Sequence, residues 1–122
     1  MCGIFGYCNY MVEKSRKDII DTLTEGLSKL EYRGYDSTGI AVDGDVDGTS
    51  LIIKNPGKVS QLKEKINNTL DFDKYNPEYI NHIGIAHTRW ATHGEPTVNN
   101  AHPQRSDING EFVVVHNGII TN

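Results

Sequence analysis

The sequence has few cysteines, no long apolar run and no large excess of one sign of charge, and each of these absences excludes some classes of protein. The 122 residues hold only two cysteines, Cys2 and Cys8. No stretch with the pattern of a secretory signal peptide precedes them, and two cysteines six positions apart make a poor disulfide framework. We therefore expect two reduced thiols in a cytoplasmic protein. No apolar run comes near the roughly 18 residues of a membrane helix, so we expect no membrane association.

The charges are nearly balanced. Lys and Arg number 12 and Asp and Glu number 16, which gives a net charge of −4, and the basic residues form no block. A nucleic-acid-binding surface needs clustered basic side chains, so we expect no nucleic-acid partner. With 37% hydrophobic and 23% charged residues, the composition is that of an ordinary globular domain with one modest core.

The apolar periodicity predicts an α+β domain. Residues 15–32 carry apolar side chains at helical spacing, and Ser15 with Asp18 three positions later resembles a capping box. The turn-rich stretch DGDVDG between two β-rich runs predicts a hairpin. The expected elements are strands at 3–9, 38–42, 50–54, 82–88 and 111–117, and helices at 15–32 and 58–70.

A long segment with little periodicity, residues 89–110, separates the last two expected strands. Irregular segments of this length in a compact domain are usually functional or disordered. The chain then stops directly after a strand pattern, with no further helix to cover the sheet. We therefore expect residues 1–122 to be the N-terminal part of a longer polypeptide.

One stretch has the opening pattern of a calcium-binding EF-hand loop, with Asp43, Asp45, Asp47 and Gly48 at the required spacing. The twelfth position of such a loop is a bidentate glutamate, and Lys54 stands there. An ammonium group at that vertex repels the cation, and the flanking runs predict strands instead of helices. We interpret this stretch as a solvated hairpin turn.

Histidines gather in the second half of the chain, at His87, His93, His102 and His116. None of them forms an HExxH pair or stands beside a CxxC pair, which are the spacings typical of zinc sites. A single histidine is more often a hydrogen-bonded structural residue than a ligand. We expect no metal.

Cys2 directly follows the initiator methionine, and removal of Met1 would leave it with a free α-amino group. The reference pKa of such an amine is about 7.7 to 8.0 and that of a thiol is about 8.5, so the amine is able to accept the thiol proton. An N-terminal cysteine therefore carries its own base for nucleophilic catalysis. On position alone, an incidental small residue remains the simpler interpretation.

Several blocks taken together change that interpretation. They are MCGIFGY, LEYRGYDSTGIAV, GIAHTRWATHGEP, NAHPQRSD and FVVVHNGIITN, and they run in order from the first residue to the last. The chain resembles the class II glutamine amidotransferases, and most of all the glutaminase domain of the glutamine–fructose-6-phosphate amidotransferase family. The resemblance implies the N-terminal-nucleophile hydrolase fold, a four-layer αββα sandwich with two antiparallel sheets.

The resemblance also implies a mechanism. Cys2 would attack the side-chain amide of glutamine, release ammonia and form a thioester that water then hydrolyses. The oxyanion donors implied by the HNG motif are the side-chain amide of Asn117 and the backbone N–H of Gly118. Loss of one such donor typically costs about 10²- to 10³-fold in rate. No metal or organic cofactor is implied.

Glutamine recognition is implied for the HTRWATHG motif. Arg89 would bind the substrate carboxylate, Thr92 and His93 would line the same pocket, and Trp90 would stand at the mouth of the ammonia route. His102, in NAHP, matches a position near a loop that closes over glutamine.

A further block, YRGYDS, supplies supporting residues. By resemblance Arg33, Tyr35 and Asp36 brace the N-terminal strand. The family's acidic residue for the substrate ammonium follows the HNG motif, and the chain ends before it; the synthase domains that bind fructose 6-phosphate lie outside the chain too. Those domains would make glucosamine 6-phosphate, and the full-length family member is implied to be a homo-oligomer.

Three alternatives remain open at this stage. The families of phosphoribosyl-pyrophosphate amidotransferase and asparagine synthetase share the N-terminal cysteine, although the YRGYDS and HTRWATHG blocks favour the sugar enzyme. The third is a catalytically silent, truncated paralogue that acts as an interaction or regulatory module.

Overall fold

The computed structural model describes residues 2–31, 36–46, 48–90 and 94–121 of the chain. Within these ranges the chain forms two helices and eight strands. In chain order they are β1 (Gly3–Asn9), β2 (Lys14–Ser15), α1 (Arg16–Leu30), β3 (Ser37–Asp43), β4 (Ser50–Pro56), α2 (Val59–Thr69), β5 (Glu78–Tyr79), β6 (His82–Arg89), β7 (Gln104–Arg105) and β8 (Val113–Val114).

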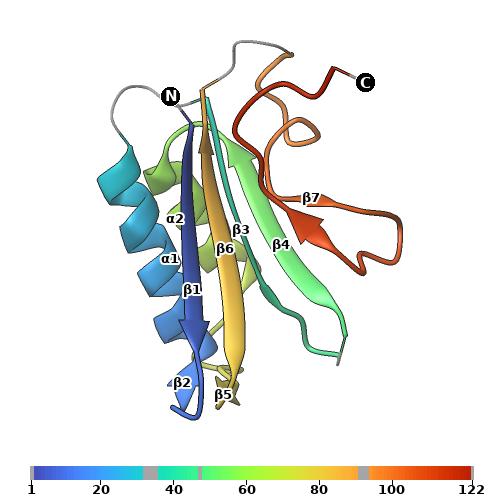
Figure 1. The fold of residues 1–122 in the computed structure, drawn as a ribbon. Coiled ribbons are helices and arrows are strands. Elements are labelled where there is room, and N and C mark those ends of the chain that lie inside the picture. The colour runs from blue at the N-terminus through green and yellow to red at the C-terminus, as the bar shows by residue number, and fades with distance from the viewer. Residues whose placement is uncertain (1, 32–35, 47, 91–93, 122) are drawn as a thin grey trace.

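A four-stranded antiparallel sheet in the order β1-β6-β3-β4 organises the molecule (Figure 1). Strand β6 comes late in the chain but lies inside the sheet, between β1 and β3. The predicted hairpin is confirmed as β3 and β4. The short strands form two further ladders, β2-β5 and β7-β8, which are also antiparallel. The α+β class expected from the sequence is therefore confirmed.

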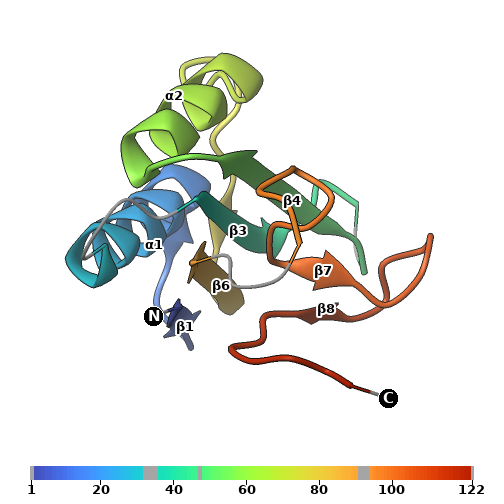
Figure 2. The same cartoon turned by 90° about the horizontal axis from the view of Figure 1, so that it is seen from above.

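Both helices pack on one face of the sheet, where the core lies (Figure 2). Helix α1 begins as predicted, because Ser15 Oγ accepts a hydrogen bond of 3.1 Å from the backbone N–H of Asp18. Full burial of one aliphatic side chain contributes about 1.5–3 kcal/mol. The buried core consists of Ile19, Ile20, Leu23, Leu27, Ile40, Val42, Ile53, Val59, Leu62, Ile66 and Ala86.

The opposite face of the sheet carries the segment that follows β6. Lys54 of β4 holds this segment, because its Nζ donates to the carbonyls of Ala101 at 2.9 Å and Pro103 at 3.1 Å. Gly39 of β3 leaves the room that the segment needs, since a Cβ atom there would overlap the carbonyl of His102. The backbone around His102 therefore lies directly on the sheet. Figures 1 and 2 show β7 and β8 on the side away from the helices.

The helix ends lie close to the predicted positions. Helix α1 spans Arg16–Leu30 where 15–32 was expected, and α2 spans Val59–Thr69 where 58–70 was expected. Residue 32 lies outside the described residues. Among the residues that are described, no helix is long and apolar enough to cross a bilayer.

The expected buried strand at 111–117 is wrong in its extent and its burial. Only Val113–Val114 forms a strand, and it pairs with the two-residue β7 instead of joining the four-stranded sheet. Phe112 is 72% exposed and Val114 is 52% exposed. The apolar run is there, but within the described part of the chain its only partner strand is too short to bury it. The two-residue ladders themselves carry too little periodicity to be predicted.

Candidate functional site

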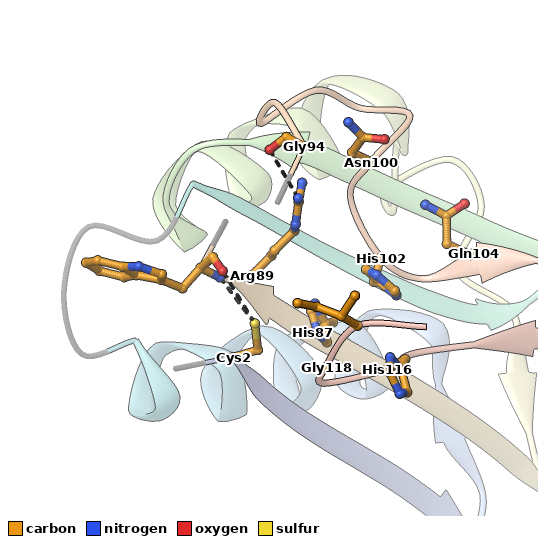
Figure 3. A pocket seen from close by; sticks show the side chains of 11 residues that line it. Cys2, His87, Arg89, Gly94, Asn100, His102, Gln104, His116 and Gly118 are labelled. Atoms are coloured by element: carbon orange, nitrogen blue, oxygen red, sulfur yellow. Dashed lines mark hydrogen bonds between the residues drawn. The ribbon is translucent and has the colours of Figure 1, made fainter. Parts of the chain in front are cut away.

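A cavity of about 550 Å³ lies on the face of the sheet opposite the helices, where β1 begins and β6 ends (Figure 3). It is lined by residues from four segments that are far apart in the sequence. These include Cys2 ahead of β1, His87 and Arg89 of β6, His102 in the segment after β6, and His116 and Gly118 after β8.

The pairing of β1 with β6 brings Cys2 to this cavity. Gly3 lies opposite Thr88 in the ladder, and its N–H donates to Thr88 Oγ1 at 3.0 Å. A Cβ at position 3 would lie 2.8 Å from Thr88 Oγ1 and 3.0 Å from Leu30 Cβ, so only glycine fits this close approach without a shift. The backbone N–H of Trp90 then faces the sulfur of Cys2 at 3.4 Å. The thiol is therefore fixed at the edge of the sheet.

The HNG segment meets Cys2 although the two are separated by almost the whole chain. Asn117 Nδ2 donates to the backbone carbonyl of Cys2 at 2.9 Å. On its other side, Asn117 Oδ1 lies 2.9 Å from Nε2 of His87. Gly118 follows with a φ of 137°, a backbone conformation that glycine adopts most readily, and it lines the cavity. The two ends of the described chain thus form one wall.

Two neighbouring imidazole rings also line the cavity. His87 and His102 have ring centroids 4.6 Å apart. Burial lowers the pKa of His87 to about 4, although the hydrogen bond to Asn117 Oδ1 opposes the shift. Burial also lowers the pKa of His102, and the positive charge of Arg89 adds to that effect. Both rings are therefore neutral at pH 7.

Arg89 brings a permanent positive charge to the cavity. Its Nη1 donates to the carbonyl of Glu95 and its Nη2 to the carbonyl of Gly94, each at 3.3 Å. These are long contacts to neutral acceptors, and a carboxylate would be a shorter, charge-assisted partner for the planar guanidinium. Trp90, the next residue, also lines the cavity and is partly exposed.

The structure brings several of the predicted site residues together around the cavity, namely Cys2, Arg89, Trp90, His102 and Gly118, with Asn117 bonded to Cys2. The predictions for Thr92, His93, Arg33 and Tyr35 fall outside the described residues.

Asp36 lies next to the site through its backbone. Its N–H donates to the carbonyl of Arg89 at 3.1 Å, and its carbonyl accepts from the N–H of Gly57 at 2.7 Å. It therefore ties the start of β3 to the end of β6, close to Cys2.

Sequence reasoning did not assign His87, His116, Asn100 and Gln104 to the site that this cavity forms. A signal for His87 exists, because side chains two positions apart on a strand point to the same face. His87 and Arg89 have this spacing on β6. Gln104 lies in the two-residue strand β7, and Asn100 and His116 lie in irregular segments, so no periodicity indicates the direction of these side chains.

The calcium-like loop lies away from the cavity, and the carboxylates of Asp43 and Asp45 contact protein nitrogen atoms. Asp43 Oδ2 lies 2.6 Å from Nδ1 of the buried His82, and Asp45 Oδ1 lies 2.7 Å from Nη1 of the buried Arg16. Across the described ranges, no cluster of His, Cys, Asp and Glu is arranged to hold a metal ion. The loop joins a hairpin, as the sequence predicts.

The chain is similar over its whole length to curated proteins. It is 64% identical over 126 residues to the glutamine–fructose-6-phosphate aminotransferase [isomerizing] of Saccharomyces cerevisiae, 100% of this chain and 17% of that protein. It is 54% identical to the glutamine–fructose-6-phosphate aminotransferase [isomerizing] 1 of Rattus norvegicus, and it spans 19% of that protein. A putative member from S. cerevisiae is 57% identical, and the chain spans 46% of it. No protein-family model matches the chain.

An α+β chain in which a cysteine at position 2 meets an HNG segment 115 residues later has the arrangement expected of a class II glutamine amidotransferase. Over its whole length the chain is homologous to the N-terminal glutaminase fragment of the glutamine–fructose-6-phosphate aminotransferases, which are enzymes. It spans less than half the length of these relatives.

Proposed function

We propose that this chain carries the glutaminase half-reaction, the hydrolysis of the glutamine side-chain amide through a thioester on Cys2. The observation that carries the proposal is the 2.9 Å hydrogen bond from Asn117 Nδ2 to the Cys2 carbonyl at the edge of the cavity. It joins a candidate nucleophile to a candidate oxyanion donor. The glutamine-dependent activity named for the relatives supports the same assignment.

In the first half of the reaction, removal of Met1 frees the α-amino group of Cys2, which takes the thiol proton. The thiolate attacks the amide carbon of glutamine, and the carbonyl oxygen becomes an oxyanion. Asn117 Nδ2 and the N–H of Gly118 donate to that oxygen. Collapse of the intermediate breaks the carbon–nitrogen bond, and the proton held by the amine leaves with ammonia.

In the second half, water attacks the thioester while the α-amino group accepts its proton. The carbon–sulfur bond breaks, the sulfur recovers the proton, and glutamate leaves. Each proton is taken and returned by the same amine, so the cycle needs no other base. No cofactor or metal enters the proposed reaction.

Substrate recognition in this proposal depends on charge. Arg89 binds the α-carboxylate of glutamine, the proposal gives Thr92 and His93 a place in the same pocket, and Trp90 and His102 border it. The lining residues of the described cavity include no aspartate or glutamate. We therefore propose that the acidic residue that accepts hydrogen bonds from the substrate ammonium lies beyond residue 122, in a longer polypeptide.

The complete protein is proposed to be a cytoplasmic homo-oligomer in which further domains bind fructose 6-phosphate and use the ammonia to make glucosamine 6-phosphate. Residues 1–122 would then be the N-terminal part of the glutaminase domain, with the N-terminal-nucleophile hydrolase fold. The sheet supports this, because Ile4 and Ile83 are 47% and 66% exposed on the face away from the helices. A second sheet would cover them.

Incubation of the full chain with glutamine, with glutamate and ammonia measured, tests the proposal. Mass spectrometry of the N-terminus first establishes that Met1 is absent. We expect Cys2→Ser to abolish turnover and Cys8→Ser to leave it unchanged, because Cys8 is exposed on β1 and lies outside the cavity. Met1-free chain that binds glutamine but releases no glutamate would favour the silent regulatory module instead.

A further inference from the structure

We propose that His87 is a positioning residue: a neutral imidazole that donates from Nε2 and thereby holds the Asn117 amide with its N–H groups toward Cys2. The catalytic consequence of this arrangement rests on the function proposed above. The arrangement itself follows from the hydrogen bonds that join the buried His87, the exposed Asn117 and the half-buried Cys2.

The orientation of the Asn117 amide follows from the group that it faces at Cys2. A backbone carbonyl only accepts hydrogen bonds, so the amide atom 2.9 Å from the Cys2 carbonyl must be the donor Nδ2. The other amide atom, Oδ1, then points at Nε2 of His87, again at 2.9 Å. Because Oδ1 only accepts, the proton of the neutral His87 ring must be on Nε2.

The His87 ring is enclosed by the sheet and by the segment that carries His102. His87 is 1% exposed and lies opposite Ile4 of β1 and Gly39 of β3. The His102 ring lies against it, and Lys54 fixes the carbonyls on both sides of His102. Rotation of the ring would therefore need movement of the whole segment.

The other ring nitrogen explains why the ring stays neutral. Nδ1 of His87 is buried and has no hydrogen-bond partner. A second proton would have to sit there. Burial lowers the pKa of His87 to about 4, and His102 and Arg89 lower it further, while Asn117 and the backbone of His116 oppose the shift. Nε2–H is therefore the form present at pH 7.

The opposite tautomer would reverse the arrangement. With the proton on Nδ1, Nε2 would become an acceptor and repel Oδ1, so the Asn117 amide would have to turn over. Oδ1 would then face the Cys2 carbonyl, and no side-chain N–H would be left for an oxyanion. The position of one proton on His87 thus decides whether Asn117 is able to act as a donor.

Two substitutions at His87 distinguish the effect of its Nε2–H donor from the effect of its ring. His87→Phe keeps a planar ring and removes the donor, and we expect kcat for glutamine hydrolysis by the full chain to fall about 10- to 100-fold, less than full loss of an oxyanion donor. KM should change less than about twofold, because the ground-state carboxylate contact is untouched. His87→Gln returns an N–H near the position of Nε2, and we expect it to recover most of kcat.

His82 supplies the matched control. It is also buried on β6 but lies outside the cavity, with Nδ1 2.6 Å from Asp43. His82→Phe should lower the free energy of unfolding and leave kcat unchanged in the folded fraction. A His87→Gln variant as slow as His87→Phe, or a His87→Phe variant no slower than His82→Phe, would overturn the positioning role.

A spectroscopic measurement tests the tautomer without any turnover. In the full chain labelled with ¹⁵N at histidine, we expect His87 to show a protonated Nε2 and a bare Nδ1 at pH 7. A protonated Nδ1, or titration near the ordinary pKa of about 6.5, would overturn the proposal whatever the activity. If the wild-type chain fails to hydrolyse glutamine while His87 shows the Nε2–H form, the proposed function fails and the arrangement stands.

Discussion

The two faces of the four-stranded sheet are built from different kinds of contact. On the helix face, aliphatic side chains from α1, α2 and the sheet are almost completely buried. On the other face, hydrogen bonds connect Cys2, His87 and Asn117, and the aliphatic side chain of Ile83 remains 66% exposed. The difference indicates that one face supplies the stability of the fold and the other supplies the site, so substitutions should separate the two.

The largest effect on stability is expected from the helix face. Leu23 is fully buried between α1 and the sheet, and Leu23→Ala should lower the free energy of unfolding by about 2–5 kcal/mol through lost burial and a cavity. Urea unfolding followed by circular dichroism measures it. Ile83→Ala on the opposite face should cost less than about 1 kcal/mol. Equal losses at the two positions would contradict the division of the sheet.

The largest effect on activity is expected from the site face. Asn117→Ala removes a candidate oxyanion donor, and kcat/KM for glutamine should fall about 10²- to 10³-fold, or about 2.7–4 kcal/mol of transition-state stabilisation. The unfolding free energy should fall by only about 1–3 kcal/mol, because Asn117 is itself exposed but its loss leaves the buried Nε2–H of His87 without an acceptor. Asn68→Ala, at an exposed position of α2, is the matched control and should change neither quantity. Unchanged kcat/KM in Asn117→Ala would remove the oxyanion role.

The pH dependence of stability should also come from the site face. The pKa of His87 is lowered to about 4 in the folded chain and is about 6.5 in an unfolded chain, so the unfolded state binds more protons between these values. Stability is therefore complete above about pH 6.5 and is lost as pH falls toward 4, with a slope of at most about 1.4 kcal/mol per pH unit for one proton. Unfolding free energies measured from pH 7 to pH 4.5 test this.

Other groups contribute to the same pH range, so a variant is needed to isolate His87. The pKa values of His82 and His102 are also lowered, chiefly by burial. The His87→Gln variant keeps those groups and lacks the one in question. The difference between wild type and variant should shrink as the pH falls, and parallel curves would show that His87 does not titrate as described.

Local signals predicted the elements well. The strand at 3–9 is β1, and the cap at Ser15 forms because side-chain oxygen and backbone N–H lie within one turn. The order of the strands in the sheet was not predictable, because the position of β6 between β1 and β3 depends on contacts between residues about 44 to 85 positions apart, which produce no periodic pattern. The run at 111–117 was misjudged because burial depends on a partner, which apolar composition does not supply.

For the site, the resemblance contributed more than periodicity did. Cys2 and the HNG segment were selected by matching blocks, and the hydrogen bond from Asn117 to the Cys2 carbonyl is consistent with their pairing. His87 was weighed as a metal ligand against a hydrogen-bonded structural residue, and the second was preferred without a partner being assigned to it. Its contact with Asn117 depends on where the segment after β8 crosses the sheet, and no local pattern encodes that crossing.

The smallest expected effect connects the two faces through β4. Lys54 donates to the carbonyls of Ala101 and Pro103, and burial lowers the pKa of its ammonium group. Lys54→Met keeps the aliphatic length and removes both hydrogen bonds, so stability should fall by about 1 kcal/mol and kcat/KM by about threefold as His102 becomes less well held. Lys65→Met is the control, because Lys65 bonds the backbone of Lys54 and not the segment that carries His102. It should reduce stability alone, and an equal loss of kcat/KM in both variants would mean that Lys54 acts through general stability and not through the site.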